Sequence, residues 1–141
     1  MTARILLVDD EKVALRNLEH VLGKQGYAIT ATQSGSHALE LLEAQPFDLV
    51  LTDLKMEKID GMQILRRCKA HHPDVEVIMI TGHGELDLAI KSIQHDAVDF
   101  VTKPIHDEVL AIALGRAREK IEMRRTLSAY TQNLEQIVAE K

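Results

Sequence analysis

The sequence has few of the residues on which several classes of protein depend. It contains no tryptophan, one cysteine and only 3% aromatic residues. The single cysteine, Cys68, cannot form an internal disulfide and has no neighbouring cysteine for a metal site, so we expect a reduced, partly buried thiol. The scarcity of aromatic residues leaves little material for stacking nucleic-acid bases. These shortages exclude a disulfide scaffold and argue against a base-stacking surface.

Long apolar runs and a positive net charge are also missing. No apolar run is long enough to cross a bilayer, and the opening "MTARILLVDD" turns acidic too early for a signal peptide. The net charge of -5 argues against the concentrated basic patch that phosphate binding needs. We therefore expect a cytoplasmic protein that neither binds membranes nor contacts nucleic acid directly.

What is present suits one globular domain with a real core, because 45% of the 141 residues are hydrophobic and 28% are charged. Apolar runs of strand length alternate with amphipathic segments whose apolar residues recur every three or four positions. The strand-like runs cover residues 5 to 8, 27 to 31, 47 to 51, 75 to 80 and 98 to 101. This alternation predicts an α/β fold with a parallel sheet wrapped by helices.

Polar residues stand where four of these strands end. The first strand is followed by Asp9 and Asp10, the third by Asp53, the fourth by Thr81, and the fifth leads to Lys103. Helix capping or a polar turn can explain several of them one at a time. Neither explains acids, a hydroxyl and a lysine at the ends of four strands. Since the carboxyl ends of parallel strands share one edge, the pattern predicts a site there.

The chemistry of this set favours phosphoryl transfer. Carboxylates brought close together hold either a proton or a cation. Oxygen ligands with room for waters and a phosphate suit Mg²⁺ better than Zn²⁺. A carboxylate beside Mg²⁺ and a lysine can attack phosphorus, because the two cations neutralise charge on the phosphoryl oxygens. A nearby threonine hydroxyl can then donate a hydrogen bond to the attached group.

Four blocks of the sequence resemble a known family. "LLVDDEK", "LTDLKM" with Gly61 further on, "MITGHG" and "DFVTKP" resemble, in order and spacing, the signature blocks of the receiver domain of two-component response regulators. The resemblance covers about residues 4 to 121. It implies a flavodoxin-like, doubly wound, five-stranded parallel sheet of order 2-1-3-4-5 with helices on both faces. It also implies a signalling protein without a separate substrate, which catalyses its own phosphorylation from a donor and its own dephosphorylation.

The resemblance assigns roles to the residues at the strand ends. Asp53 would accept a phosphoryl group from a histidine kinase. Asp10 and Asp53, with the backbone carbonyl of Lys55, would hold Mg²⁺, and Asp9 would assist directly or through water. Lys103 would pair with the phosphoryl oxygens.

A switch is implied as well. Thr81 would move towards the phosphate and the ring of Phe100 would turn inward, which would alter the surface of the fourth helix, fifth strand and fifth helix. A phenylalanine on an apolar strand can equally be a plain core residue. The bond between Lys103 and Pro104 is expected to be cis.

Two positions depart from the family pattern. Glu57 stands where proline is frequent, and Asp96 stands where glycine is frequent. Aspartate tolerates the left-handed conformation better than most residues, so we expect the fold to persist at Asp96. We expect Glu57 to tune Mg²⁺ affinity or the choice of kinase.

A long helix is predicted from about Asp107 towards the C-terminus, which extends beyond a receiver domain of residues 1 to 121. Within residues 122 to 141 an apolar stripe follows steps of four and three: Met123, Leu127, Tyr130, Leu134 and Ile137. The segment is similar to connectors that precede output domains and favours a coiled-coil homodimer. The surface of the fourth helix, fifth strand and fifth helix is a second candidate dimer face. The alternative is a frayed, solvated helix.

Two other functions compete with the signalling receiver. One is a Mg²⁺-dependent phosphatase or phosphotransferase acting through an aspartyl phosphate. Such enzymes usually carry a second acid two residues after the nucleophile, where this chain has Lys55, and a cap for which it has no insertion. The other is an unphosphorylated dimerisation scaffold, which would have no need to keep repelling carboxylates together.

Overall fold

Five strands alternate with five helices in the computed structural model, which describes residues 2–140 and the side chains up to residue 134. The strands are β1 (Arg4–Val8), β2 (Ala28–Thr32), β3 (Leu49–Asp53), β4 (Glu76–Thr81) and β5 (Asp99–Thr102). The helices are α1 (Lys12–Lys24), α2 (Gly35–Ala44), α3 (Gly61–His71), α4 (Leu86–Gln94) and α5 (Asp107–Glu140). Each lies within a few residues of the segment that the sequence predicts.

The strands form one parallel sheet in the order β2-β1-β3-β4-β5, which confirms the predicted order. The register pairs Val8 with Thr52, Asp53 with Ile80, and Thr81 with Thr102. The carboxyl ends of β1, β3, β4 and β5 therefore lie side by side. The order reverses between β1 and β3, where ligands of such sheets bind.

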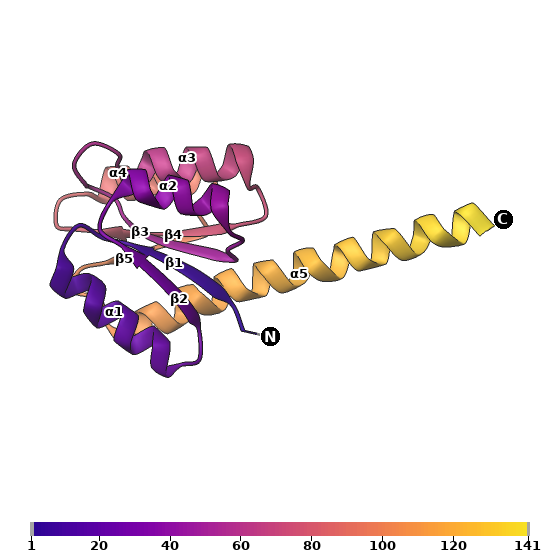
Figure 1. Ribbon diagram of the computed structural model, residues 1–141, viewed down its shortest axis with the longest axis horizontal. Coiled ribbons are helices and arrows are strands. Elements are labelled where there is room, and N and C mark those ends of the chain that lie inside the picture. Colours follow the sequence, from indigo (N-terminus) through magenta and orange to yellow (C-terminus); the bar gives the residue numbers. More distant parts are fainter. Residues whose placement is uncertain (1, 141) are drawn as a thin grey trace.

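Helices cover both faces of the sheet (Figure 1). Successive strand residues point to opposite faces, so Ile5 and Leu7 contact α1 and α5, whereas Leu6 and Val8 face α2 and α3. Every residue of β3 and β4 is buried. Cys68 of α3 is fully buried, not partly buried as expected, and burial raises the pKa of its thiol to about 11. The polar residues at the strand ends thus stand on a rigid, covered support.

Two backbone details agree with expectation. Asp96 adopts the left-handed conformation, with φ of 74°, in the turn between α4 and β5. The peptide bond between Lys103 and Pro104 is cis. In the loop after β3, Lys58 also takes a positive φ of 65°, which the sequence had not indicated.

Helix α5 runs along one face of the sheet and then continues away from the domain (Figure 1). Ile121 is the last buried residue of α5 among those whose side chains are described. Met123, Leu127, Tyr130 and Leu134 are then 46–65% exposed. The side chain of Ile137, the last residue of the predicted stripe, lies outside the described part. None of the described helices combines the length and hydropathy needed to cross a bilayer.

Candidate functional site

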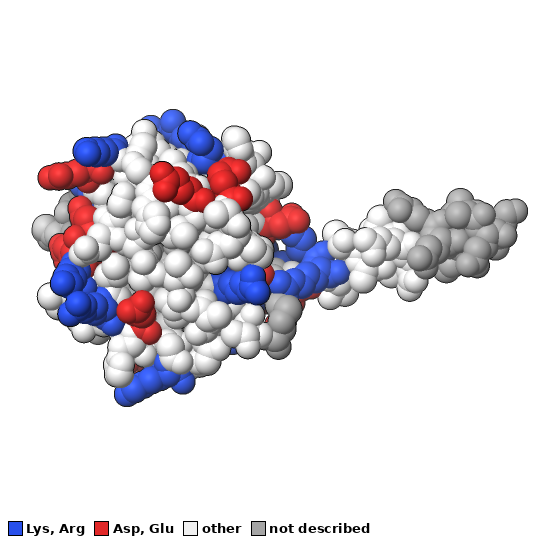
Figure 2. Space-filling view, in the orientation of Figure 1, with Lys and Arg blue, Asp and Glu red and all other residues white. Residues whose placement is uncertain are grey.

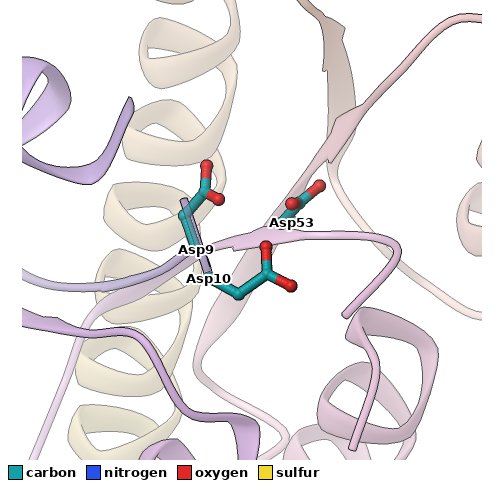
Figure 3. Close-up of side chains that lie close together, drawn as sticks. All are labelled: Asp9, Asp10 and Asp53. Atoms are coloured by element: carbon teal, nitrogen blue, oxygen red, sulfur yellow. The ribbon is translucent and has the colours of Figure 1, made fainter. Parts of the chain in front are cut away.

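Three carboxylates meet at the edge of the sheet where β1 and β3 end (Figure 3). Asp9 and Asp10 follow β1, and Asp53 is the last residue of β3. One carboxylate oxygen from each lies within 4.8 Å of those of the other two. Asp9 and Asp53 are buried, and Asp10 is exposed. The structure therefore brings together the acids that the sequence predicted at this edge.

Lys103 reaches the same carboxylates from the loop after β5. Its Nζ lies 3.3 Å from Asp9 Oδ2 and 3.4 Å from Asp53 Oδ2. Glu11 Oε2 lies 3.8 Å from the same nitrogen, a partner that the sequence had not suggested. Burial works to lower the pKa of Lys103, but attraction by Asp53, Asp9 and Glu11 outweighs it and raises that pKa. The lysine thus stays charged and faces the candidate phosphoryl acceptor.

The pKa of Asp53 is raised from 3.8 to about 7. Burial is the largest cause, and repulsion by Asp9 and, more weakly, Asp10 adds to it. The charge of Lys103 and its hydrogen bond to Asp53 act in the opposite direction. A single lysine therefore does not neutralise the three acids, and a further cation would favour the ionised form of Asp53.

The acid cluster suits a hard divalent cation. Asp9 Oδ2 is buried and accepts no hydrogen bond, although Lys103 is near. In the described part of the chain, this trio is the only group of three or more acidic, histidine or cysteine residues placed to share an ion. Its donors are all carboxylate oxygens, which suit Mg²⁺ rather than Zn²⁺. The residues present therefore fit the ion that the sequence suggested.

The loop after Asp53 folds back onto it. A Cβ on Gly61 would overlap the backbone oxygen of Asp53 and would lie 2.9 Å from Leu54 Cα. Gly61 N also donates to Leu54 O at 2.9 Å, and Asp60 begins α3 with a capping box. Glycine at position 61 therefore lets residues 54 to 60 turn tightly over the end of β3.

Thr81 does not cap a helix, so the capping explanation that is open to strand-end residues does not apply to it. Its hydroxyl donates to Val101 O at 3.3 Å, and the N-cap of α4 is Glu85. Asp10 does not cap α1 either, because the N-cap position belongs to Glu11. Capping thus explains neither residue.

Phe100 is partly buried and contacts the core between the sheet and the helices α2, α3 and α4. It lies on β5, one strand away from the end of β4 where Thr81 stands. Lys55 and Glu57 in the loop after β3 are both exposed. These positions agree with the places that the sequence assigned to them, and their roles remain predictions.

Besides Glu11, a second acid beside the site was missed. Glu85 is only 8% exposed, and its Oε2 accepts a hydrogen bond from Gly82 N at 2.6 Å. Its Oε1 lies 4.0 Å from Lys55 Nζ. The sequence offered one signal for this contact, because Glu85 stands three residues after Gly82, which follows β4. At this spacing a side chain can reach back to a backbone amide.

Comparison with known proteins identifies the family. A family model for the response regulator receiver domain matches residues 5–115. The alginate biosynthesis transcriptional regulatory protein AlgB of Pseudomonas putida is 35% identical over 126 residues, which cover 89% of this chain and 28% of AlgB. This chain therefore spans less than a third of that relative.

Solved structures agree. A response regulator receiver domain protein from Clostridium thermocellum is 35% identical, with a TM-score of 0.80 over 89% of this chain and 98% of that one. NtrX from Brucella abortus is 30% identical, with a TM-score of 0.86 over 92% of this chain and 30% of NtrX. The family match covers most of the chain, and the acids, the threonine and the lysine lie inside it. The chain belongs to the response regulator receiver domains of two-component signalling systems.

Proposed function

We propose that this receiver is switched when Asp53 accepts a phosphoryl group from a histidine kinase. The observation that carries the proposal is the position of Asp53, buried at the end of β3 with Lys103 Nζ 3.4 Å from its Oδ2. The three clustered carboxylates are placed to hold the divalent cation that the proposed reaction needs. Membership of the receiver family supports a phosphohistidine of the kinase as the donor of the phosphoryl group.

In the proposed reaction, an ionised oxygen of Asp53 attacks phosphorus. The new oxygen–phosphorus bond forms as the nitrogen–phosphorus bond of the donor breaks, and the electron pair of that bond remains on the imidazole. Lys103 stabilises negative charge on the transferring group, because its ammonium already faces Asp53. Water later attacks the acyl phosphate, which releases phosphate and restores Asp53.

The cation of the proposed site is Mg²⁺. Asp9, Asp10 and Asp53 would hold it, together with the backbone carbonyl of Lys55. When bound, Mg²⁺ neutralises charge on the phosphoryl oxygens. The buried Asp9 oxygen that accepts no hydrogen bond supports this assignment. Glu57, exposed in the same loop, is proposed to tune the affinity for the ion or the choice of kinase.

The proposed switch acts through Thr81 and Phe100. The Thr81 hydroxyl must leave Val101 O before it can bond a phosphoryl group on Asp53. The partly buried ring of Phe100 would then turn inward, which would change the surface formed by α4, β5 and α5. This surface exposes three apolar residues of α4: Leu86, Ile90 and Ile93. It is therefore suited to a dimer contact or a downstream partner.

The extension of α5 is proposed to be a dimer-forming connector. We place the end of the receiver at Ile121 and the connector at residues 122–141, because the exposed apolar stripe begins at Met123. We further propose that the response is transcriptional, since AlgB is described as a transcriptional regulatory protein. The match covers only 28% of AlgB, so this proposal places no DNA contact on the present chain.

The aspartyl-phosphate phosphatase alternative is less well supported. It needs an acid two residues after the nucleophile, and Lys55 occupies that position with a side chain that is 68% exposed. The position two residues after Asp53 therefore offers no carboxyl group to protonate a leaving alcohol.

Incubation with acetyl phosphate and Mg²⁺, followed by intact-mass measurement, tests the proposed acceptor. The wild-type chain and an Asp107→Asn control should each gain one phosphoryl group, and Asp53→Asn should gain none. Chelation of Mg²⁺ should abolish the gain. Modification that persists in Asp53→Asn, or a wild-type chain that no donor modifies, would overturn the proposal.

A further inference from the structure

Glu85 is the last residue of the loop after β4, and its side chain links that loop to the loop that follows Asp53. It immediately precedes α4, yet its side chain does not cap that helix. One carboxylate oxygen accepts from Gly82 N at 2.6 Å, in the loop after β4, and the other lies 4.0 Å from Lys55 Nζ, in the loop after β3. A carboxylate with so little exposure needs polar partners. Its two partners, Gly82 and Lys55, come from separate loops at the edge of the sheet where Asp53 lies.

The amide of Gly82 belongs to the surroundings of Asp53. Strands β3 and β4 pair in register, with Asp53 opposite Ile80, and Leu54 N donates to Ile80 O at 2.8 Å. Gly82 follows Thr81, the last residue of β4. Its N–H is therefore a backbone donor at the end of the strand next to the acceptor.

Both donors at this strand end are already occupied. The Thr81 hydroxyl donates to Val101 O at 3.3 Å, and the Gly82 amide donates to Glu85 Oε2 at 2.6 Å. A phosphoryl group brings about two negative charges and three strong acceptor oxygens. A phosphoryl group on Asp53 can use these two donors only if each gives up its present acceptor.

We propose that Glu85 is an internal competitor of the phosphoryl group, whose carboxylate occupies the Gly82 amide until phosphorylation of Asp53 displaces it. This inference rests on the proposed function, in which Asp53 is the acceptor. Displacement frees Glu85 at the start of α4 and separates it from Lys55. Glu85 thereby holds the loop after β4 in its resting arrangement and lowers the affinity of the site for the phosphoryl group.

A purely structural role for Glu85 predicts an effect of opposite sign. If the carboxylate only braced the loop, its removal would loosen the donors and weaken binding of a phosphoryl analogue. If the carboxylate competes, its removal strengthens binding. The sign of the change therefore separates the two roles.

The test compares Glu85→Ala with Asp87→Ala in the full chain. Asp87 lies in the first turn of α4 and is exposed, so its removal changes the charge equally without touching Gly82. Beryllofluoride with Mg²⁺ is titrated while the amide signal of Gly82 is followed by NMR. Glu85→Ala should bind on the order of tenfold more tightly, because a hydrogen bond to a charged acceptor no longer competes. Asp87→Ala should stay within about twofold of wild type, as expected of an exposed charge.

The resting spectra give a readout that needs no analogue. The Gly82 amide proton should move upfield in Glu85→Ala, since it loses a short bond to a carboxylate. With beryllofluoride bound, wild type and Glu85→Ala should show the same Gly82 signal. Glu85→Gln, which keeps an oxygen acceptor but no charge, should fall between them and serves if the alanine variant does not fold.

Unchanged or weaker binding by Glu85→Ala would overturn the competitor role, and so would an equal gain in Asp87→Ala. A wild-type chain that binds no analogue would instead contradict the acceptor role of Asp53. The Gly82 signal of the resting protein would still report whether Glu85 holds the amide, so the two failures are distinguishable.

Discussion

At the scale of the residue, Asp53 combines burial with a charged neighbourhood. Its pKa rises from 3.8 to about 7, chiefly because burial disfavours its charged form. The unfolded chain ionises this group near pH 4, whereas the folded chain holds the proton up to about pH 7. Over this interval the folded state binds more protons than the unfolded state, so the contribution of Asp53 to stability falls as pH rises.

Asp53→Asn should therefore stabilise the metal-free fold at pH 8. The expected gain is about 1–3 kcal/mol in the free energy of unfolding, and it should shrink as pH falls towards 5. Thermal or urea unfolding with a chelator present measures it. A variant less stable than wild type at pH 8 would show that the ion pair with Lys103 outweighs the cost of burying the charge.

Gly61 is the second residue on which the site depends. Gly61→Ala should cost about 1–3 kcal/mol, because the new methyl group meets the backbone at Asp53 and Leu54 rather than a flexible side chain. Gly115→Ala is the matched control. Nothing lies within 4 Å of a Cβ there, and alanine favours a helix, so that variant should gain up to about 1 kcal/mol. Urea unfolding compares them, and equal stability of the two variants would contradict the tight loop.

At the scale of the element, a buried carboxylate joins β4 to α5 at the edge of the sheet opposite the site. Glu76, the first residue of β4, is fully buried and lies 3.2 Å from Arg124, 3.4 Å from Lys120 and 3.4 Å from Lys69. Two of these cations belong to α5, and basic side chains gather where that helix leaves the domain (Figure 2). Glu76 thus anchors the start of the connector.

Glu76→Gln should loosen that anchor, because three cations would face a neutral side chain. We expect a loss of about 1–3 kcal/mol in stability and faster amide hydrogen exchange in α5 around Lys120 and Arg124. Phosphorylation of Asp53, at the far edge, should persist. Asp74→Asn is the control, since its side chain is 86% exposed and touches only the same Arg124. Unchanged amide hydrogen exchange of α5 in Glu76→Gln would show that Glu76 does not anchor the connector.

The sequence predicted the elements whose position depends on neighbouring residues in the chain. The apolar runs and the residues at their ends indicated the strands, and the acids, Thr81 and Lys103 do meet at one edge. Glu76 and Glu85 were not recognised, because their meaning depends on partners brought by other elements. The apolar run "VEVIMI" predicted a strand, but it did not reveal that two cations of α5 contact Glu76 within it. Such contacts arise only after the helices and strands have packed.

At the scale of the whole molecule, α5 projects beyond the domain (Figure 1). The apolar stripe on this part of the helix is exposed. Leu127→Glu should prevent the proposed dimer, because a charge would enter a coiled-coil seam. Ala129→Glu adds the same charge to the same helix off the stripe and should dimerise like wild type. Sedimentation at several concentrations, with and without phosphorylation, measures the outcome. A wild-type chain that remains monomeric throughout would contradict the connector role.

In the proposed function a single carboxylate, that of Asp53, receives the phosphoryl group. Borohydride reduces an acyl phosphate to an alcohol, which converts a phosphorylated aspartate to homoserine and marks it permanently. After incubation with a phosphorylated histidine kinase or acetyl phosphate, reduction and peptide mass spectrometry should place homoserine at position 53. Homoserine at position 9 or 10 instead, or at no position in a folded, Mg²⁺-supplied chain, would contradict the role of Asp53 as the phosphoryl acceptor.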